Sequence, residues 1–85
     1  MEIQIETHTL ERAEERGTNE EEIRDTLLTG VDIPGKRGRL GKAKVYAFNQ
    51  NRGSKYYEEK RVEVFYVIED DTIITVTVYV FYGKW

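Results

Sequence analysis

The only histidine of the chain, His8, is followed by arginines at positions 12 and 16. In an α-helix, residues four apart lie on one face, so His8, Arg12 and Arg16 would form a single stripe. An imidazole can act as a general base near neutral pH, and guanidinium groups bind phosphate. The stripe therefore fits either a phosphate-handling site with a base at its end or an ordinary solvent-exposed helix face.

The charges around this stripe favour a partner outside the helix. Arg12 and Arg16, like Glu11 and Glu15, are like-charge pairs at a spacing of four residues, which destabilises an isolated helix. The opposite charges of Arg12 and Glu15, three residues apart, offset only part of this cost. The segment is not arranged to optimise its own surface electrostatics.

A second basic cluster lies in the glycine-rich segment GKRGRLGK, residues 35–42. The segment fails the Walker phosphate-loop pattern, because Lys36 replaces the first glycine and Ala43 replaces the Ser or Thr that would bind magnesium. A nucleotide-hydrolysing site is therefore excluded. Two interpretations remain, a solvated loop or contact with a nucleic-acid backbone, and both involve Lys36, Arg37, Arg39, Lys42 and Lys44.

Composition limits the classes of site that the chain can hold. The 85 residues suffice for one domain, residues 1–85, with a small core. With no cysteine and one histidine, we expect no metal site, no cysteine nucleophile and no cofactor. The net charge of −3 argues against non-specific nucleic-acid binding by the whole surface. No apolar run could cross a membrane, and MEIQIE is not a secretion signal, so we expect a cytoplasmic location.

The elements that must position these residues begin with a short strand and two helices. Ile3 and Ile5 alternate with polar residues, which predicts the strand. The first helix is expected over about 8–16, with Thr7 as its N-cap and Gly17 at its left-handed C-terminal position. Thr18 and Glu21 match a capping box, which predicts a second helix that stops at Gly30.

Three strands are predicted after a proline- and glycine-punctuated loop over residues 31–41. They cover 42–49, 60–69 and 72–82, with a looser connection whose turn is 52–54 and a tight turn at 70–71. The expected architecture is an α+β domain: a short N-terminal strand, two helices and a three-stranded antiparallel meander, with the helices packed on one sheet face.

Period-two alternation sorts the strand residues into two faces. A β-branched face is expected beneath the helices and comprises Val62, Val64, Tyr66, Ile68, Ile74, Val76, Val78 and Val80. The opposite face mixes rings, hydroxyls and charges and comprises Arg61, Glu63, Phe65, Val67, Ile73, Thr75, Thr77, Tyr79 and Phe81. If Tyr46 and Phe48 point the same way, Lys42 and Lys44 do so too.

The rings on the second face have two explanations. They could form a homodimer surface or simply reflect the preference of Tyr, Phe and Thr for strands. Alternatively, the rings could stack on nucleic-acid bases while the cations contact phosphates. The residues alone leave both explanations open.

The chain also resembles a known family. HxxxRxxxRG at 8–17, TNEEEI at 18–23, the basic loop and ITVTVY at 74–79 are similar to a small bacterial family of unknown function associated with RelE-like and BrnT-like toxin ribonucleases. The resemblance covers most of the chain and is firmest over His8–Ile23 and Thr72–Tyr79. RelE-type toxins pack helices on one sheet face and cut messenger RNA with basic and tyrosine residues on the other.

The resemblance implies a metal-independent endoribonuclease or an inactive relative of one. Its pattern is matched by His8, Arg12, Arg16 and Thr77, whereas the acidic net charge departs from typical toxins. His8 would accept the proton of an attacking 2′-hydroxyl, and cationic side chains would stabilise charge on phosphorus. The nominated catalytic residues are His8, Arg12, Lys44, Arg61, Thr77 and Tyr79. The nominated RNA-binding residues are Arg16, Lys36, Arg37, Arg39, Lys42, Tyr46, Phe65 and Tyr82.

Two further hypotheses come from the residues themselves. One is a non-catalytic interaction module, a homodimer or an antitoxin-like partner protein, joined through the aromatic face. The other is a nucleic-acid binder without chemistry, whose affinity would fall steeply with salt.

Overall fold

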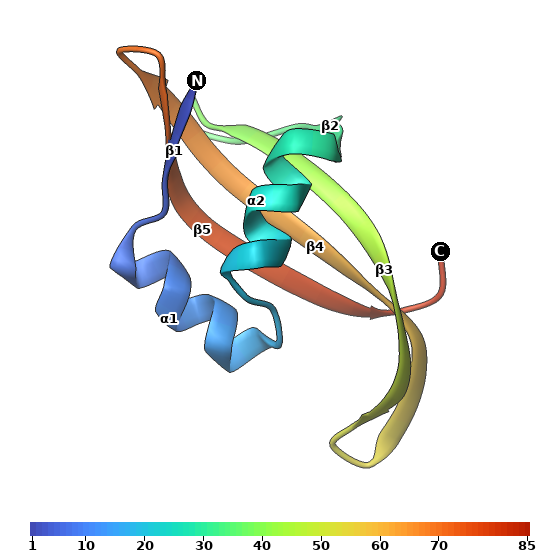
Figure 1. Ribbon diagram of the computed structural model, residues 1–85. Coiled ribbons are helices and arrows are strands. Elements are labelled where there is room, and N and C mark those ends of the chain that lie inside the picture. Colours follow the sequence, from blue (N-terminus) through green and yellow to red (C-terminus); the bar gives the residue numbers. More distant parts are fainter.

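The structure is a computed structural model that describes all 85 residues, and it has an α+β fold. The elements follow in the order β1 (Glu2–Gln4), α1 (Thr7–Arg16), α2 (Glu20–Thr29), β2 (Val31–Ile33), β3 (Leu40–Arg52), β4 (Lys55–Glu69) and β5 (Thr72–Gly83). The strands form one sheet in the order β1-β5-β4-β3-β2, in which only the β1–β5 pair is parallel (Figure 1).

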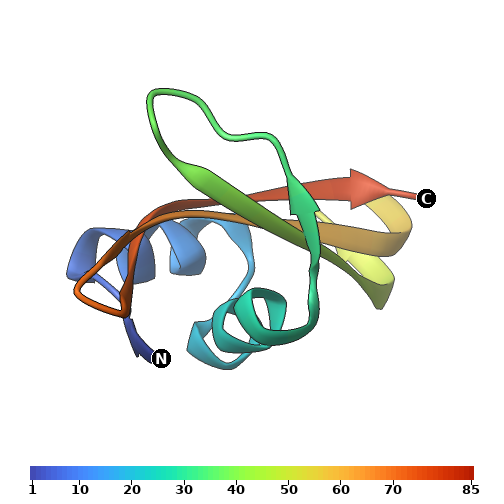
Figure 2. The ribbon, with the colours of Figure 1, turned by 90° about the horizontal axis from the view of Figure 1, so that it is seen from above.

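Both helices lie on the same side of the sheet, as predicted, and no helix covers the other side (Figure 2). A cluster of buried side chains lies between the two layers and comprises Ala13, Ile23, Leu27, Val62, Val64, Tyr66 and Val78. Burial of this apolar surface is the main favourable term for so small a sheet. Neither helix, at ten residues each, has the length and apolar character needed to cross a membrane.

The helix caps differ from the sequence prediction. Residue Glu6, not Thr7, is the N-cap of α1, and it makes no side-chain cap hydrogen bond. Gly17 does adopt the predicted left-handed conformation, with φ 94°. The N-cap of α2 is Asn19, whose side chain accepts from the Glu22 N–H at 2.9 Å. Thr18 makes other contacts: its N–H donates to the Ala13 carbonyl at the end of α1, and its hydroxyl donates to the Glu22 carboxylate at 2.8 Å.

The segment expected to be a loop over 31–41 contains a fifth strand. Val31–Ile33 pairs antiparallel with Gly41–Ala43, so the loop shrinks to residues 34–39. The alternation Val-Asp-Ile before the proline is a strand pattern that the punctuation of the segment conceals. The looser connection predicted over residues 50–59 is also wrong, because β3 and β4 remain paired up to Arg52 and Lys55, although its turn lies at Gly53–Ser54, within the predicted 52–54. The tight turn at Asp70–Asp71 is confirmed, with φ of 50° and 64°.

A β-bulge in β5 changes which side chains face the helices. Phe65 pairs with Thr77, and Tyr66 pairs with Thr75, so Val76 has no partner on β4. The prediction that Ile74 and Val76 lie beneath the helices is therefore wrong, because the extra residue reverses the alternation. Thr75 instead lies beneath α1, only 2% exposed, where its hydroxyl donates to that of Thr9 at 2.9 Å and accepts from the Glu6 N–H at 3.0 Å. The neighbouring Ile73 also turns inward and packs against the core.

The side assignment of β3 is also corrected. Lys44 pairs directly with Val62, and Lys42 with Val64, and directly opposed residues of antiparallel strands share a face. Lys42, Lys44 and Tyr46 therefore lie on the helix side rather than with the outer rings. We call the other side the open face; its strand residues include Val45, Arg61, Glu63, Phe65, Val67, Thr77, Tyr79 and Phe81.

Because of the bulge, substitutions of two threonines of β5 should have different effects on the free energy of unfolding. Thr75→Val should lower the free energy of unfolding by about 1–3 kcal/mol, because the partly buried Glu6 N–H loses its acceptor and the buried Thr9 hydroxyl loses its donor. Thr77→Val, on the open face, should change it by less than about 0.5 kcal/mol. Urea denaturation of the two variants measures the difference, and a larger effect at Thr77 than at Thr75 would contradict the register.

Candidate nucleic-acid interface

A hollow of about 280 Å³ lies on the open face, between the β2–β3 loop and the sheet. The loop contributes Pro34, Lys36 and Arg39, and the strands contribute Phe65, Thr77 and Tyr79. Figure 2 shows this loop rising from the sheet on the side opposite the helices. Five of the six lining residues were nominated from the sequence. The exception is Pro34, and the only feature of the sequence that could have pointed to it is its position at the start of the basic loop.

Aromatic rings form the floor of the hollow and continue along β5. Phe65 lies edge-on to Tyr79, with ring centroids 5.9 Å apart, and the rings of Tyr79 and Phe81 are 6.4 Å apart and nearly parallel. Gly41 makes room for the first of these rings, since a β-carbon there would lie 3.0 Å from Phe65 Cε1. The rings thus offer stacking surfaces beside the loop cations.

Arg16 reaches from α1 around the edge of the sheet to this row of rings. Its Nη1 donates to the Val78 carbonyl at 2.7 Å, and its guanidinium carbon lies 4.7 Å from the centroid of the Tyr79 ring. The Val78 carbonyl is available because β1 pairs with β5 only over residues 72–74. Arg16 therefore holds Tyr79 in place and adds positive charge next to the ring.

The cations of the β2–β3 loop lack the partners that most others have. Seven Lys or Arg side chains form ion pairs with carboxylates: Arg12, Arg24, Lys42, Lys44, Lys60, Arg61 and Lys84. Arg16 and Arg52 donate to backbone carbonyls. The remaining four of the 13 make neither contact: Lys36, Arg37, Arg39 and Lys55. Three of these four lie in the loop, and no carboxylate lines the hollow.

The opposite layer of the molecule is acidic. The two helices carry seven acidic side chains and three basic ones. Phosphate is therefore repelled from the helix side and attracted to the loop on the other side. The net charge of −3 describes the whole chain and conceals this separation.

His8 and Arg12 lie away from the open face. His8 is exposed on α1, and the hollow beside it is lined only by residues of that helix: His8, Glu11, Arg12, Glu14 and Glu15. Arg12 pairs with Glu15 at 3.0 Å. Three carboxylates in this hollow oppose a phosphate, and the structure brings neither side chain to Thr77 or Tyr79. No group of three or more His, Asp or Glu side chains is placed to hold a metal ion.

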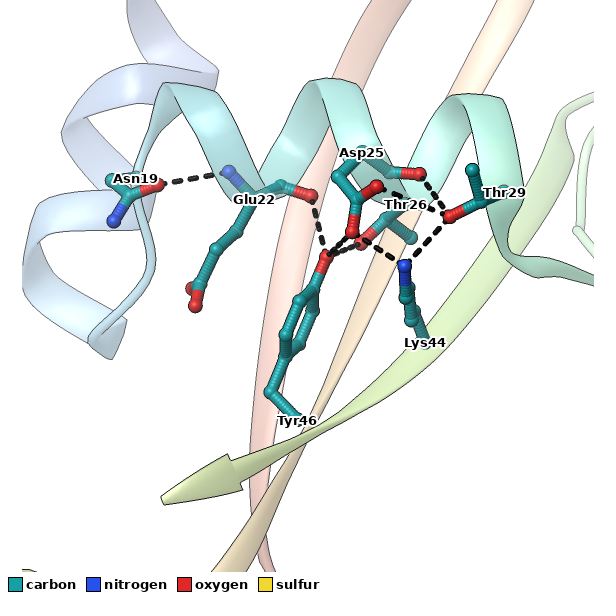
Figure 3. A network of polar contacts seen from close by, with 7 residues as sticks. All are labelled: Asn19, Glu22, Asp25, Thr26, Thr29, Lys44 and Tyr46. Atoms are coloured by element: carbon teal, nitrogen blue, oxygen red, sulfur yellow. Dashed lines mark hydrogen bonds and ion pairs between the residues drawn. The ribbon is translucent and has the colours of Figure 1, made fainter.

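Lys44 and Tyr46 fasten α2 to β3 through Asp25 (Figure 3). The Asp25 carboxylate accepts from Lys44 Nζ and from the Tyr46 hydroxyl, each at 2.6 Å, and Lys44 also donates to Thr29. The hydrogen bond from Lys44, followed by that from Tyr46, lowers the pKa of Asp25. Burial, with the hydrogen bond to Asp25, raises the pKa of Tyr46 to about 12. Both nominated residues therefore hold the helix layer to the sheet.

Tyr82, Lys42 and Arg61 are also committed to contacts within the molecule. The Tyr82 hydroxyl donates to the Arg16 carbonyl at 2.6 Å, and burial raises its pKa. Lys42 pairs with Asp32 of β2 at 2.7 Å, and the hydrogen bond between them raises the pKa of Lys42. Arg61 lies on the open face but is neutralised by Glu63 at 2.9 Å. Of the nominated residues, Arg16, Lys36, Arg39, Phe65, Thr77 and Tyr79 are the ones brought together.

The Asp25 contacts predict an acid dependence of stability. The pKa of Asp25 is lower in the folded chain than in the unfolded chain. The contribution of the ionised Asp25 carboxylate to the free energy of unfolding is therefore complete above about pH 4 and is lost as the pH falls further. Asp25→Asn should therefore be less stable than the parent at pH 7, and the difference should shrink below pH 4.

The matched control is Glu14→Gln, an exposed position of α1 that has no hydrogen bond or ion pair. Thermal unfolding across pH 3–7 measures both variants. If the stability difference between Asp25→Asn and the parent stayed constant down to pH 3, the contacts of the Asp25 carboxylate with Lys44 and Tyr46 would not stabilise the fold as described.

Comparison of the chain with protein-family models, with curated proteins and with solved structures gives no match.

Proposed function

We propose that this protein binds single-stranded RNA on the open face of its sheet. Phosphates contact Lys36, Arg37 and Arg39 in the loop, and bases stack on the rings of Tyr79 and Phe81. The observation that carries the proposal is the position of the loop cations, which have no carboxylate partner and border a hollow floored by aromatic rings. Anionic backbone and flat bases are the two features that such a surface complements.

The shape of the surface favours a single strand over a duplex. Stacking on Tyr79 or Phe65 requires bases whose faces are free, and the bases of a duplex are stacked on one another. The hollow between the loop and the sheet accommodates an unpaired nucleotide, because its volume is about 280 Å³. The acidic helices on the far side restrict the binding strand to the open face.

The alternative is a protein partner on the open face. A second copy of this chain complements the charges of that face less well than RNA does. Two copies joined through their open faces would bury the Arg61–Glu63 pair at the interface. The acidic helices lie on the opposite side, and the open-face carboxylates Glu63 and Glu59 are already bound to Arg61 and to the Trp85 N–H. An anionic polymer satisfies the loop cations directly.

Metal-independent cleavage of the bound RNA, as in RelE-like toxins, is a second candidate. It is favoured by one observation, that two cations and a tyrosine line the same hollow without any carboxylate. The 2′-hydroxyl would lose its proton to solvent and attack the adjacent phosphorus, and Lys36 and Arg39 would stabilise the charge that develops there. As the bond to the 5′-oxygen breaks, Tyr79 would donate a proton to that oxygen and then be reprotonated by water. His8 has no part in this scheme because it lies on α1.

Binding is tested by the fluorescence anisotropy of a labelled oligouridylate. Tyr79→Leu should weaken the affinity by about tenfold, a typical loss for one stacked base. Lys36→Ala combined with Arg39→Ala should weaken the affinity and reduce the slope of log affinity against log salt by about 1.4, that is about 0.7 for each lost phosphate contact on a single strand. Arg24→Ala, which removes an ion-paired cation on α2, is the control and should bind as the parent does.

Binding at the open face would be contradicted if the parent, Tyr79→Leu, the double variant and Arg24→Ala all bound with equal affinity. It would also be contradicted if Arg24→Ala lost as much affinity as the open-face variants. The cleavage candidate requires product in the presence of EDTA that persists in His8→Ala and disappears in Tyr79→Phe. Light scattering separates the protein-partner alternative, for which Phe81→Glu would convert a dimer to a monomer.

A further inference from the structure

Trp85 lies two residues beyond β5, and two contacts place it on the open face. Its backbone N–H donates to Glu59 Oε1 at 2.6 Å. Its indole ring lies over Gly83, where a β-carbon would be 3.6 Å from Cη2 and 3.7 Å from Cζ3. Gly83 and Glu59 are cross-strand partners, and alternation from Tyr79 through Phe81 directs both toward the open face.

The indole thus continues the row of rings that begins at the hollow. Tyr79 and Phe81 occupy successive outward positions of β5, and Gly83 leaves the next position without a side chain. Trp85 folds back and fills it. The three residues are 42%, 47% and 52% exposed, so each presents a surface to solvent.

We propose that Trp85 is the stacking position farthest from the hollow in a short single-strand site along β5. This inference rests on the proposed RNA-binding function. The site begins with a phosphate and a base at the hollow beside Tyr79, continues over Phe81 and ends on the indole. The spacing of 6.4 Å between the first two rings exceeds the roughly 3.4 Å rise of stacked bases, so each ring takes one base of an extended strand.

The two ends of this row supply different interactions. The hollow end has the unpartnered cations Lys36 and Arg39, which bind phosphate. The Trp85 end has the Glu59 carboxylate, which is bound to the Trp85 N–H and offers no attraction to phosphate. Affinity should therefore depend on salt mainly through the hollow and on chain length mainly through Trp85.

The test uses the fluorescence of Trp85, the only tryptophan of the chain. Uridine oligonucleotides of two, three, four and six residues are titrated into the full protein, and binding is followed in parallel by anisotropy. We expect the dinucleotide to bind without quenching the indole, and the trinucleotide, tetranucleotide and hexanucleotide, which can place a third base on Trp85, to quench it.

Variants separate stacking from support of the fold. Trp85→Leu should lower the affinity for the tetranucleotide by about tenfold and leave the affinity for the dinucleotide unchanged. Trp85→Phe should retain most of the parent's affinity for the tetranucleotide. Tetranucleotide binding with unchanged indole fluorescence and no effect of Trp85→Leu would overturn this inference and leave the proposed function standing. Quenching by the dinucleotide equal to that by the tetranucleotide would overturn the assigned register. Absence of binding at every length would overturn the proposed function itself.

Discussion

The unpaired residue Val76 sets the arrangement on which the rest of the molecule depends. By shifting the alternation of β5, it buries the Thr75 hydroxyl against Thr9 and Glu6, and this contact docks the start of α1 on the sheet. Beyond the bulge, Thr77 and the rings that follow it keep the regular alternation and lie on the open face. Without the bulge, regular alternation would bury Ile74 and Val76 in place of Ile73 and Thr75, and the Glu6 N–H and the Thr9 hydroxyl would lose the threonine that they contact.

The end of α1 is held by side chains from three different strands. The last carbonyls of the helix region accept from Arg52 of β3, Lys60 of β4 and Tyr82 of β5. These donors satisfy groups that a helix C-terminus leaves unpaired, and the positive charges of Arg52 and Lys60 suit the negative end of the helix dipole. The position of α1 in turn allows Arg16 to reach the Tyr79 ring, so the helix layer supports the open face without covering it.

Local patterns predicted the helices, the tight turn and the valine-rich layer, because each depends on residues close in sequence. They did not predict the bulge, since Val76 is one β-branched residue among many and its lack of a partner is decided by pairing with β4. They also misplaced Lys44 and Tyr46, because the side that a strand presents depends on its register with its neighbour. Trp85 escaped notice because only a long-range contact with Glu59 brings it onto the sheet. For His8, helical spacing was correct but could not show that the packing of α1 on the sheet leaves the imidazole on the side opposite the open face.

The claim that the open face, and not the His8 stripe, meets the ligand can be examined residue by residue. Amide chemical shifts of the isotope-labelled protein, recorded by nuclear magnetic resonance during titration with a uridine hexanucleotide, locate the contact surface directly. The account predicts that shifts concentrate in Lys36–Arg39 and Thr77–Phe81 and at Trp85, with α1 unaffected from His8 to Arg12. Shifts centred on His8 and Arg12, with the loop and β5 unchanged, would contradict it.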